Sequence, residues 1–218
     1  MKAIRKKKDS VATIYNKERT KGKLISAVGK ILVKEGFQNI RVNKVAEVAG
    51  VAKKAIYEYF GGLDGLIKAY LDQVDFWKIE EQKLALQKNP LPPISKEFVF
   101  ELLKKDFTYF SRSTEMQKIV LWSISEKNKL VRALTDEREQ LGEHLLQKAD
   151  EIFKDTAVDY PATMAILVSA IYYTVLHAKY NGSSMCGINV STSEGRERIF
   201  KAMERLISLT YNYADVNL

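Results

Sequence analysis

The stretch from Arg41 to Phe60, RVNKVAEVAGVAKKAIYEYF, predicts two short helices joined by a tight turn at Gly50. Lys53 and Lys54 stand where the second helix is expected to begin. Cations are unfavourable there, because the helix dipole places partial positive charge at its amino terminus. A polyanion lying against that end would reverse the penalty, since helix amino termini bind phosphates. The stretch therefore indicates a helix-turn-helix that meets nucleic acid.

The charge of the chain supports this interpretation. The 218 residues carry a formal net charge of +8. Residues 1–70 hold 16 Lys/Arg and 6 Asp/Glu, a net charge of +10, whereas residues 71–218 hold 19 and 21, a net charge of −2. Such asymmetry indicates that the first third contacts nucleic acid or an anionic surface, and that the remainder has another role.

Composition and patterning predict an all-α protein. Four prolines and eleven glycines are few for a turn-rich β fold. Apolar residues with helical spacing predict helices over residues 18–35, 42–49 and 52–60, and a long helix from Leu63 into the mid-80s. Beyond the break at residues 89–93, further helices are expected from Ser95, over residues 113–125 and 128–153, from Pro161, and after a loop at residues 181–195.

These elements divide into three parts. Residues 1–17 form a basic flexible arm, which is either a solvated tail or a segment that follows phosphates or enters a minor groove. Residues 18–65 form a small helix-turn-helix head, and residues 66–218 form a helical body. The apolar stretch from Tyr160 to Ala178 is short for a membrane span, so we interpret it as a core and interface helix. No membrane partner is expected.

The head resembles the tetracycline-repressor (TetR) family of transcriptional regulators. The resemblance covers about Arg19 to Leu71 and rests on these residues: Gly36-Phe37, Val45-Ala46, Ala49-Gly50-Val51, Ile56-Tyr57, Tyr59-Phe60 and Leu66. It implies an amino-terminal helix-turn-helix head joined to a helical body that binds an effector and dimerises through its last two long helices. The implied partners are double-stranded operator DNA, an unknown small-molecule effector and a second copy of the chain.

The chain departs from the family pattern at positions expected to touch DNA. Arg41 replaces the usual Thr or Ser cap, and Ala52 replaces the Ser of Ala-Gly-Val-Ser. Lys54-Ala55 occupies the positions of a Gly-Thr pair, and Leu63 occupies the position of a lysine that contacts the DNA backbone. Glu58 adds a negative charge near these positions. These changes leave open an alternative, in which the chain is a helical dimeric binding module with a degenerate head that lacks specific DNA binding.

Candidate sites follow from these positions. The DNA-contacting residues are expected to be the polar and small residues at the starts of the two helices and the tyrosines of the second, namely Arg41, Asn43, Lys44, Ala52, Lys53, Lys54, Tyr57 and Tyr59. Aromatic residues of the body are candidates for an effector pocket or for ordinary core, namely Trp77, Phe107, Phe110, Trp122, Tyr172, Tyr173 and His177. The expected dimer interface comprises Ile171, Val175, Ile199, Met203, Leu206 and Thr210.

Catalysis is poorly supported by the sequence. Two histidines and one cysteine, Cys186, supply no metal cluster and no Cys-His pair, and the chain has no phosphate-binding glycine loop. A single cysteine excludes an intrachain disulfide and suits a reducing cytoplasm. The sequence therefore predicts a cytoplasmic, ligand-responsive DNA-binding regulator, a repressor released from a pseudo-palindromic operator by its effector. No catalytic residue, metal or cofactor is expected.

Overall fold

A computed structural model describes residues 2–86, 93–182 and 184–216 of the chain. Their regular elements are helices, apart from one isolated antiparallel bridge between Met185 and Ile188. The helices form two compact units. Unit 1 contains the chain up to Asp75 together with Leu121–Leu134, and unit 2 contains Phe76–Val120 together with Thr135–Leu218. The predicted all-α fold, with an amino-terminal helix-turn-helix and a helical body, is confirmed.

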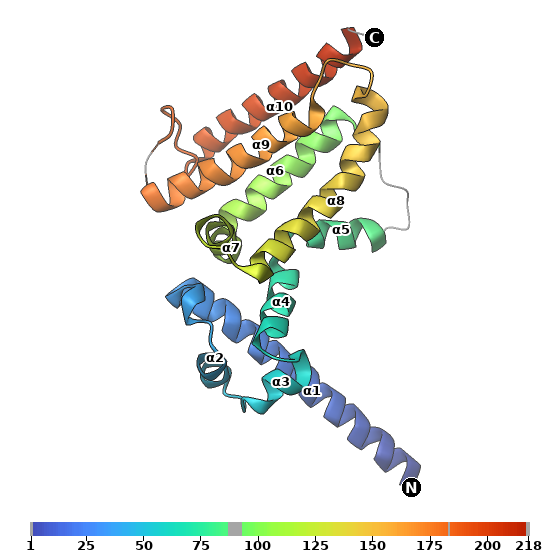
Figure 1. Cartoon of the computed structure of the whole chain (residues 1–218), viewed down its shortest axis with the longest axis vertical. Coiled ribbons are helices and arrows are strands. Elements are labelled where there is room, and N and C mark those ends of the chain that lie inside the picture. Colours follow the sequence, from blue (N-terminus) through green and yellow to red (C-terminus); the bar gives the residue numbers. More distant parts are fainter. Residues whose placement is uncertain (1, 87–92, 183, 217–218) are drawn as a thin grey trace. The chain divides into compact units, whose positions relative to one another are not determined.

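Unit 1 is built on four helices around one apolar core (Figure 1). They are α1 (Lys2–Glu35), α2 (Val42–Ala49), α3 (Lys54–Phe60) and α4 (Leu63–Val74), with a short 3-10 turn at Phe37–Asn39 between α1 and α2. Each helix contributes apolar side chains that are almost fully buried: Leu24, Val28, Ile31, Val45, Ile56 and Leu66. Burying these side chains fixes the direction of α2 and α3, because their remaining faces must then point away from the core.

The first helix is longer than the sequence predicted. Residues 1–17 were expected to form a flexible arm, but α1 begins at Lys2 and continues without interruption to Glu35. The apolar periodicity on which the prediction relied starts only at Leu24. No proline or glycine interrupts residues 2–21, and Lys, Arg and Ala are good helix formers, so the backbone can continue the helix without an apolar stripe.

The turn between α2 and α3 follows the prediction. Gly50 adopts the left-handed conformation (φ 62°, ψ 40°), which a residue with a side chain rarely tolerates. Its N–H donates to the Glu47 carbonyl at 3.1 Å, and the Val51 N–H donates to the Ala46 carbonyl at 3.1 Å. These bonds satisfy the last carbonyls of α2 and reverse the chain within a few residues.

One long helix was predicted from Leu63 into the mid-80s, and the structure has two. Helix α4 ends at Val74, Asp75 is extended (φ −77°, ψ 120°), and α5 runs over Phe76–Leu86. Asp75 and Phe76 are both buried. The compact units divide at this break rather than after residue 65. The predicted break at residues 89–93 lies almost wholly outside the described residues.

Unit 2 contains the remaining helices, α6 (Lys96–Arg112), α7 (Thr114–Ser125), α8 (Lys129–Phe153), α9 (Tyr160–Leu176) and α10 (Ser193–Val216), with a π-helical turn at His177–Asn181. The last residues of α7 and the first of α8 belong to unit 1. Ser95 caps α6 by accepting from the Phe98 N–H, as expected, and Asp159 caps α9 just before Pro161. The Thr192 hydroxyl accepts from the Gly195 N–H at the start of α10.

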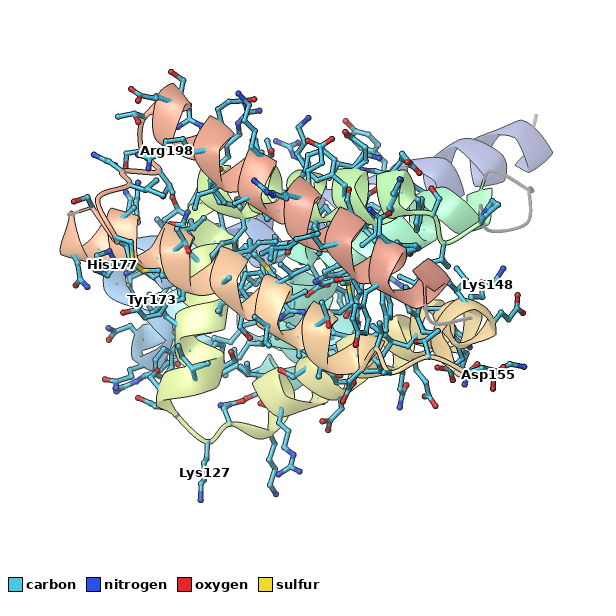
Figure 2. All side chains as sticks on the ribbon, turned by 90° about the horizontal axis from the view of Figure 1, so that it is seen from above. Lys127, Lys148, Asp155, Tyr173, His177 and Arg198 are labelled. Carbon is cyan, nitrogen blue, oxygen red and sulfur yellow. The ribbon has the colours of Figure 1, made fainter. Side chains whose placement is uncertain are left out.

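Within unit 2, α6 packs against both α9 and α10, and these two helices lie side by side (Figures 1 and 2). Aromatic rings join the layers. Phe107 of α6 meets Phe200 of α10 edge-on at 5.1 Å between centroids, and Phe153 stacks on Tyr160 at 4.5 Å. Burial raises the pKa of the Tyr160 phenol far above its usual value. These contacts join α6 to α10 and α8 to α9, and Tyr160 of α9 also meets Tyr211 of α10 edge-on at 6.3 Å.

One segment of unit 2, Tyr160–Asn181, is long and apolar enough to cross a membrane when judged only by length and composition. One side of this segment is buried in unit 2, where Leu167, Ile171 and Val175 are almost inaccessible. On its other side Ile166 and Tyr173 are exposed. The segment therefore packs one side into unit 2 and leaves a second apolar face exposed.

Candidate nucleic-acid interface

The start of α2 presents three of the predicted DNA contacts. Arg41 and Asn43 are exposed, and the Arg41 Nε donates to the Gln38 carbonyl at 3.4 Å. Lys44 is half-buried, and its Nζ lies 3.2 Å from a carboxylate oxygen of Glu35. Arg41 supplies no side-chain cap to α2. Arg41 and Asn43 are thus accessible to a phosphate, while Lys44 already has an anionic neighbour on α1.

The residues at the start of α3 are more exposed than those at the start of α2. Ala52, Lys53 and Lys54 are all exposed, and no side chain caps this helix. Tyr57 follows one turn later and is 58% exposed. Ile56 is fully buried between them and anchors the helix to the core. This arrangement directs two ammonium groups and one phenol outward, which suits phosphate contacts and hydrogen bonds to base edges.

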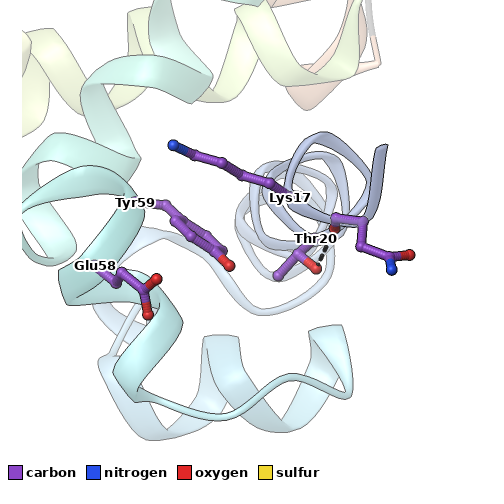
Figure 3. Close-up of a pocket in the computed structure, with 5 residues that line it drawn as sticks. Lys17, Thr20, Glu58 and Tyr59 are labelled. Carbon is purple, nitrogen blue, oxygen red and sulfur yellow. Dashed lines mark hydrogen bonds between the residues drawn. The ribbon is translucent and has the colours of Figure 1, made fainter. Parts of the chain in front are cut away.

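Tyr59 occupies a different environment from Tyr57. Its side chain is half-buried, and the Nζ of Lys17 lies 5.6 Å from the ring centroid, a cation–π distance. Figure 3 shows Lys17 of α1 running beside the Tyr59 ring. A hollow of about 320 Å³ opens here, lined by Asn16, Lys17, Thr20, Glu58 and Tyr59.

Sequence reasoning did not identify the α1 part of this hollow. Asn16, Lys17 and Thr20 were assigned to the arm or to the helix that follows it, and no apolar pattern marks their face. The only available signal was their helical spacing, i, i+1 and i+4, which places them on one face if α1 continues through them. The structure shows that α1 does so.

The end of α7 contributes to unit 1 beside the helix-turn-helix. Trp122 stacks on Phe37 with ring centroids 4.6 Å apart and planes inclined by 10°. The Gln38 Nε2 donates to the Glu126 carboxylate at 3.0 Å. Trp122 was predicted to line an effector pocket in the body, but it lies in unit 1, because α7 leaves unit 2 after Val120. Its role is to brace the connection between α1 and α2.

Three of the other predicted pocket residues come together in unit 2. The Trp77 Nε1 donates to the Tyr172 hydroxyl at 3.1 Å, and the Tyr172 ring lies 4.7 Å from that of Phe110. Gln117, almost fully buried on α7, donates from Nε2 to the Phe110 carbonyl at 2.8 Å. We call Trp77, Phe110, Gln117 and Tyr172 the aromatic–amide cluster. Gln117 was not among the predicted residues, since a lone glutamine carries no sequence signal.

The remaining predicted pocket residues lie elsewhere. Phe107 packs on Phe200. Tyr173 is 61% exposed on α9, and its ring is 5.8 Å from that of His177. Figure 2 places both Tyr173 and His177 at the same end of unit 2 as Arg198 of α10. Within the described parts of the chain, no group of three His, Cys, Asp or Glu side chains is arranged to hold a metal ion.

The predicted dimer residues divide between the inside and the outside of unit 2. Ile171, Val175 and Met203 are buried within the protomer, Ile199 and Thr210 are half-buried, and Leu206 is 52% exposed. The exposed apolar surface follows other residues of the same two helices. On α10 it comprises Ala202, Leu206, Leu209 and Tyr213, and on α9 it comprises Ala162, Ile166 and Tyr173. We call these residues the α9–α10 stripe.

Comparison with known proteins agrees with this architecture. The family of bacterial regulatory proteins named tetR matches residues 24–70, which contain the last third of α1, the whole helix-turn-helix and most of α4. A search of curated proteins finds no match to the chain.

Solved structures share the fold over most of the chain. A Clostridium perfringens protein assigned to fatty acid metabolism regulation has 16% identity and a TM-score of 0.62, covering 85% of this chain and 97% of its own. The transcriptional regulator FadR from Bacillus subtilis, solved with stearoyl-CoA, has 15% identity and a TM-score of 0.59, with coverages of 87% and 96%. A TetR family transcription regulator from Marinobacter aquaeolei VT8 has 17% identity and a TM-score of 0.58, with coverages of 88% and 97%.

These likenesses concern regulators rather than enzymes. The family match includes both helices of the helix-turn-helix, and the structural likeness extends to the helical body. The chain is therefore a DNA-binding transcriptional regulator whose head, over residues 24–70, matches the tetR family.

Proposed function

We propose that the chain is a cytoplasmic repressor that binds a pseudo-palindromic operator as a homodimer and is released by a small molecule bound in unit 2. The observation that carries the proposal is the start of α3, where Lys53, Lys54 and Tyr57 are exposed beside a fully buried Ile56. A short helix held in this way can enter a major groove without deforming the core behind it.

The α9–α10 stripe supports the homodimer. Ala202, Leu206, Leu209 and Tyr213 recur at intervals of four, three and four residues, which is the spacing of a helix–helix seam. Leu206, Leu209 and Tyr213 are each more than half exposed in the single chain. Exposure of so much apolar surface on one helix to water is unfavourable, and a second copy of the same layer would remove it. Two copies would present two helix-turn-helix heads to two half-sites.

The aromatic–amide cluster supports an effector site in unit 2. Its rings supply apolar contact, and the Gln117 Oε1 is a buried acceptor without a hydrogen-bond partner among the described residues. A ligand with a donor group would satisfy that oxygen. Because FadR from Bacillus subtilis was solved with stearoyl-CoA, long-chain acyl-CoA thioesters are the first compounds to test. An effector can release DNA only if it binds the DNA-free arrangement more tightly than the DNA-bound one.

The test is DNase I footprinting on the region upstream of the gene that encodes the chain, followed by selection of binding sites from a random duplex library. The proposal predicts one protected segment with two inverted half-sites about one helical turn, or a multiple of it, apart. Uniform protection at high protein concentration and no enriched sequence would overturn it. That result would favour the degenerate-head alternative, for which the exposed Glu58 on α3 is the structural observation.

The effector part is tested on the same footprint. Stearoyl-CoA, free stearate and free coenzyme A are added separately at equal concentrations. Loss of protection with the thioester alone would support an acyl-CoA effector. No loss with any of the three would reject this ligand class while leaving the operator result intact.

A further inference from the structure

Almost all of the net positive charge of the protein belongs to the residues that precede the segment matched by the tetR family. Residues 1–23 contain nine Lys/Arg and two Asp/Glu, a net charge of +7. Residues 24–218 contain 26 and 25, a net charge of +1. The family match begins only at residue 24. The electrostatic attraction to DNA therefore originates mainly from a segment that the helix-turn-helix does not include.

This segment is a helical continuation of α1. Helix α1 covers 34 residues, and in Figure 1 its amino-terminal turns extend past α3 within unit 1. At 1.5 Å per residue, the part ahead of Lys17 adds about 22 Å. The axial spacing of base pairs is about 3.4 Å, so a helix of this length lying along DNA would span about six base pairs.

The face of α1 that meets α3 changes its character along the helix. Leu24, Ala27 and Ile31 are buried in the unit 1 core. One to two turns earlier, the same face carries Asn16, Lys17 and Thr20, which line the hollow beside Tyr59. Continuing in helical steps of 100°, the register positions of that face are Thr13, Asp9, Lys6, Arg5 and Lys2. In sequence register, these positions thus run from apolar to polar and then to mainly basic toward the amino terminus of α1.

The hollow offers suitable groups for a phosphate. Lys17 is exposed, and its Nζ lies 5.6 Å from the centroid of the Tyr59 ring, with the Tyr59 hydroxyl at the end of the ring away from the ammonium (Figure 3). The Asn16 side chain is exposed as well. The Thr20 hydroxyl is engaged, because it donates to the Asn16 carbonyl at 2.7 Å. Glu58 also lines the hollow, and its carboxylate opposes an anion. The donors outnumber this single acceptor.

We propose that the amino-terminal extension of α1 is a second DNA-binding element, which seats one backbone phosphate in the Asn16–Lys17–Tyr59 hollow and follows the backbone outward along the Lys2–Arg5–Lys6 face. The proposal rests on the DNA-binding function proposed above. Tyr59 connects the two elements, since it belongs to α3 and also forms a wall of the hollow. The extension supplies affinity and footprint length, while sequence is read by the helix-turn-helix.

The test compares two charge-matched variants of α1. The first carries Lys2→Gln, Lys6→Gln and Lys17→Gln, all on the face that continues the hollow. The second carries Lys7→Gln, Lys8→Gln and Arg19→Gln, whose register positions lie on the opposite side of the helix. Both lose three positive charges, and glutamine keeps the helix propensity of the residues it replaces. Circular dichroism and thermal melts establish that both variants are folded.

Binding is measured by fluorescence anisotropy on a 40-base-pair duplex selected by the wild-type protein, between 100 and 300 mM KCl. For the first variant we expect the slope of log K against log salt to fall by about 5.4, because the bound dimer loses six positive charges and each phosphate that is no longer neutralised lowers the slope by about 0.9. The second variant should change the slope by less than about 1, the value for a single phosphate. Equal changes in the two variants, or no change in either, would overturn the proposal.

Two further readouts keep the inference distinct from the function on which it rests. Lys53→Ala with Lys54→Ala is measured in parallel: if it weakens binding while the first α1 variant matches the wild type, only the inference fails. If the wild type selects no duplex, both fail.

Hydroxyl-radical footprinting should show about six extra protected base pairs outside each half-site, and these should disappear in the first variant. Charge-dependent binding of α1 to phosphatidylglycerol vesicles, with DNA binding unaffected, would also overturn the proposal.

Discussion

Position 65 requires glycine, because a side chain there would collide with the backbone of Phe60, the last residue of α3. A Cβ at position 65 would lie 1.9 Å from the Phe60 carbonyl oxygen, far inside van der Waals contact. The clash is with backbone, which cannot rotate away as a side chain can. The close approach lets α4 begin directly after α3, so this glycine sets the position of the helix expected to contact DNA.

We therefore predict that Gly65→Ala lowers the free energy of unfolding of unit 1 by about 3 kcal/mol, in the range of overpacked sites. Gly142→Ala in α8 is the matched control, because a Cβ added there would have no heavy atom within 4 Å. That substitution should stabilise unit 2 by about 0.5–1 kcal/mol through helix propensity. Urea denaturation of both variants measures these two changes in the free energy of unfolding. Equal effects would contradict the assigned role of the Phe60 carbonyl.

Individual residues of the site were predictable from sequence where local geometry determines them. Gly50 was identified because a left-handed turn residue between two helices has few alternatives to glycine. Lys53 and Lys54 were singled out because cations are unfavourable at a helix amino terminus, and both side chains are exposed. The ion pair of Lys44 with Glu35 was not predictable, because it joins α2 to the end of α1 and depends on how the two helices pack.

At the scale of elements, α7 is the helix whose role differs most from the prediction. Its first half belongs to unit 2, where Gln117 holds the Phe110 carbonyl, and its last residues belong to unit 1, where Trp122 stacks on Phe37. Helical periodicity shows that Trp122 is buried, but it cannot identify the element against which the residue packs.

We predict that Trp122→Ala destabilises unit 1 by about 3–5 kcal/mol, the range for buried aromatic truncations, because it empties the space against Phe37. Ile124→Ala, two residues later on α7, is the control, since Ile124 is 73% exposed. Thermal unfolding followed by far-ultraviolet circular dichroism measures both. Similar melting temperatures for the two variants would show that the stack with Phe37 contributes little.

Helix boundaries were predictable where a residue enforces them and not elsewhere. Ser95, Pro161 and Gly36 all stand at real helix ends, because each has a local backbone or capping preference. The break at Asp75 lies between Val74 and Phe76, a sequence without glycine or proline. Burial of Asp75 and Phe76 accompanies it, so tertiary packing decides this boundary. The early start of α1 was missed because a polar helix has no apolar stripe.

At the scale of the whole molecule, the central expectation is a dimer formed by the α9–α10 stripe. We predict that Leu209→Glu converts the dimer to a monomer, because a carboxylate would be buried between two copies of the seam. Asn212→Glu adds the same charge on an exposed position of α10 outside the stripe and should leave the dimer intact. Sedimentation velocity at several protein concentrations distinguishes them. A wild-type monomer, or a dimer that persists in Leu209→Glu, would contradict this interface.

The most direct test of DNA recognition is the salt dependence of operator binding in a lysine double variant. Lys53→Ala with Lys54→Ala is compared with Lys148→Ala with Lys154→Ala, which removes two exposed cations from the other unit. If the start of α3 contacts DNA, the first pair should weaken binding to the selected duplex and lower the salt slope by about 3.6, at about 0.9 for each of four phosphates contacted by a dimer, while the second pair should match the wild type. Wild-type affinity and an unchanged slope in the first pair would contradict the account.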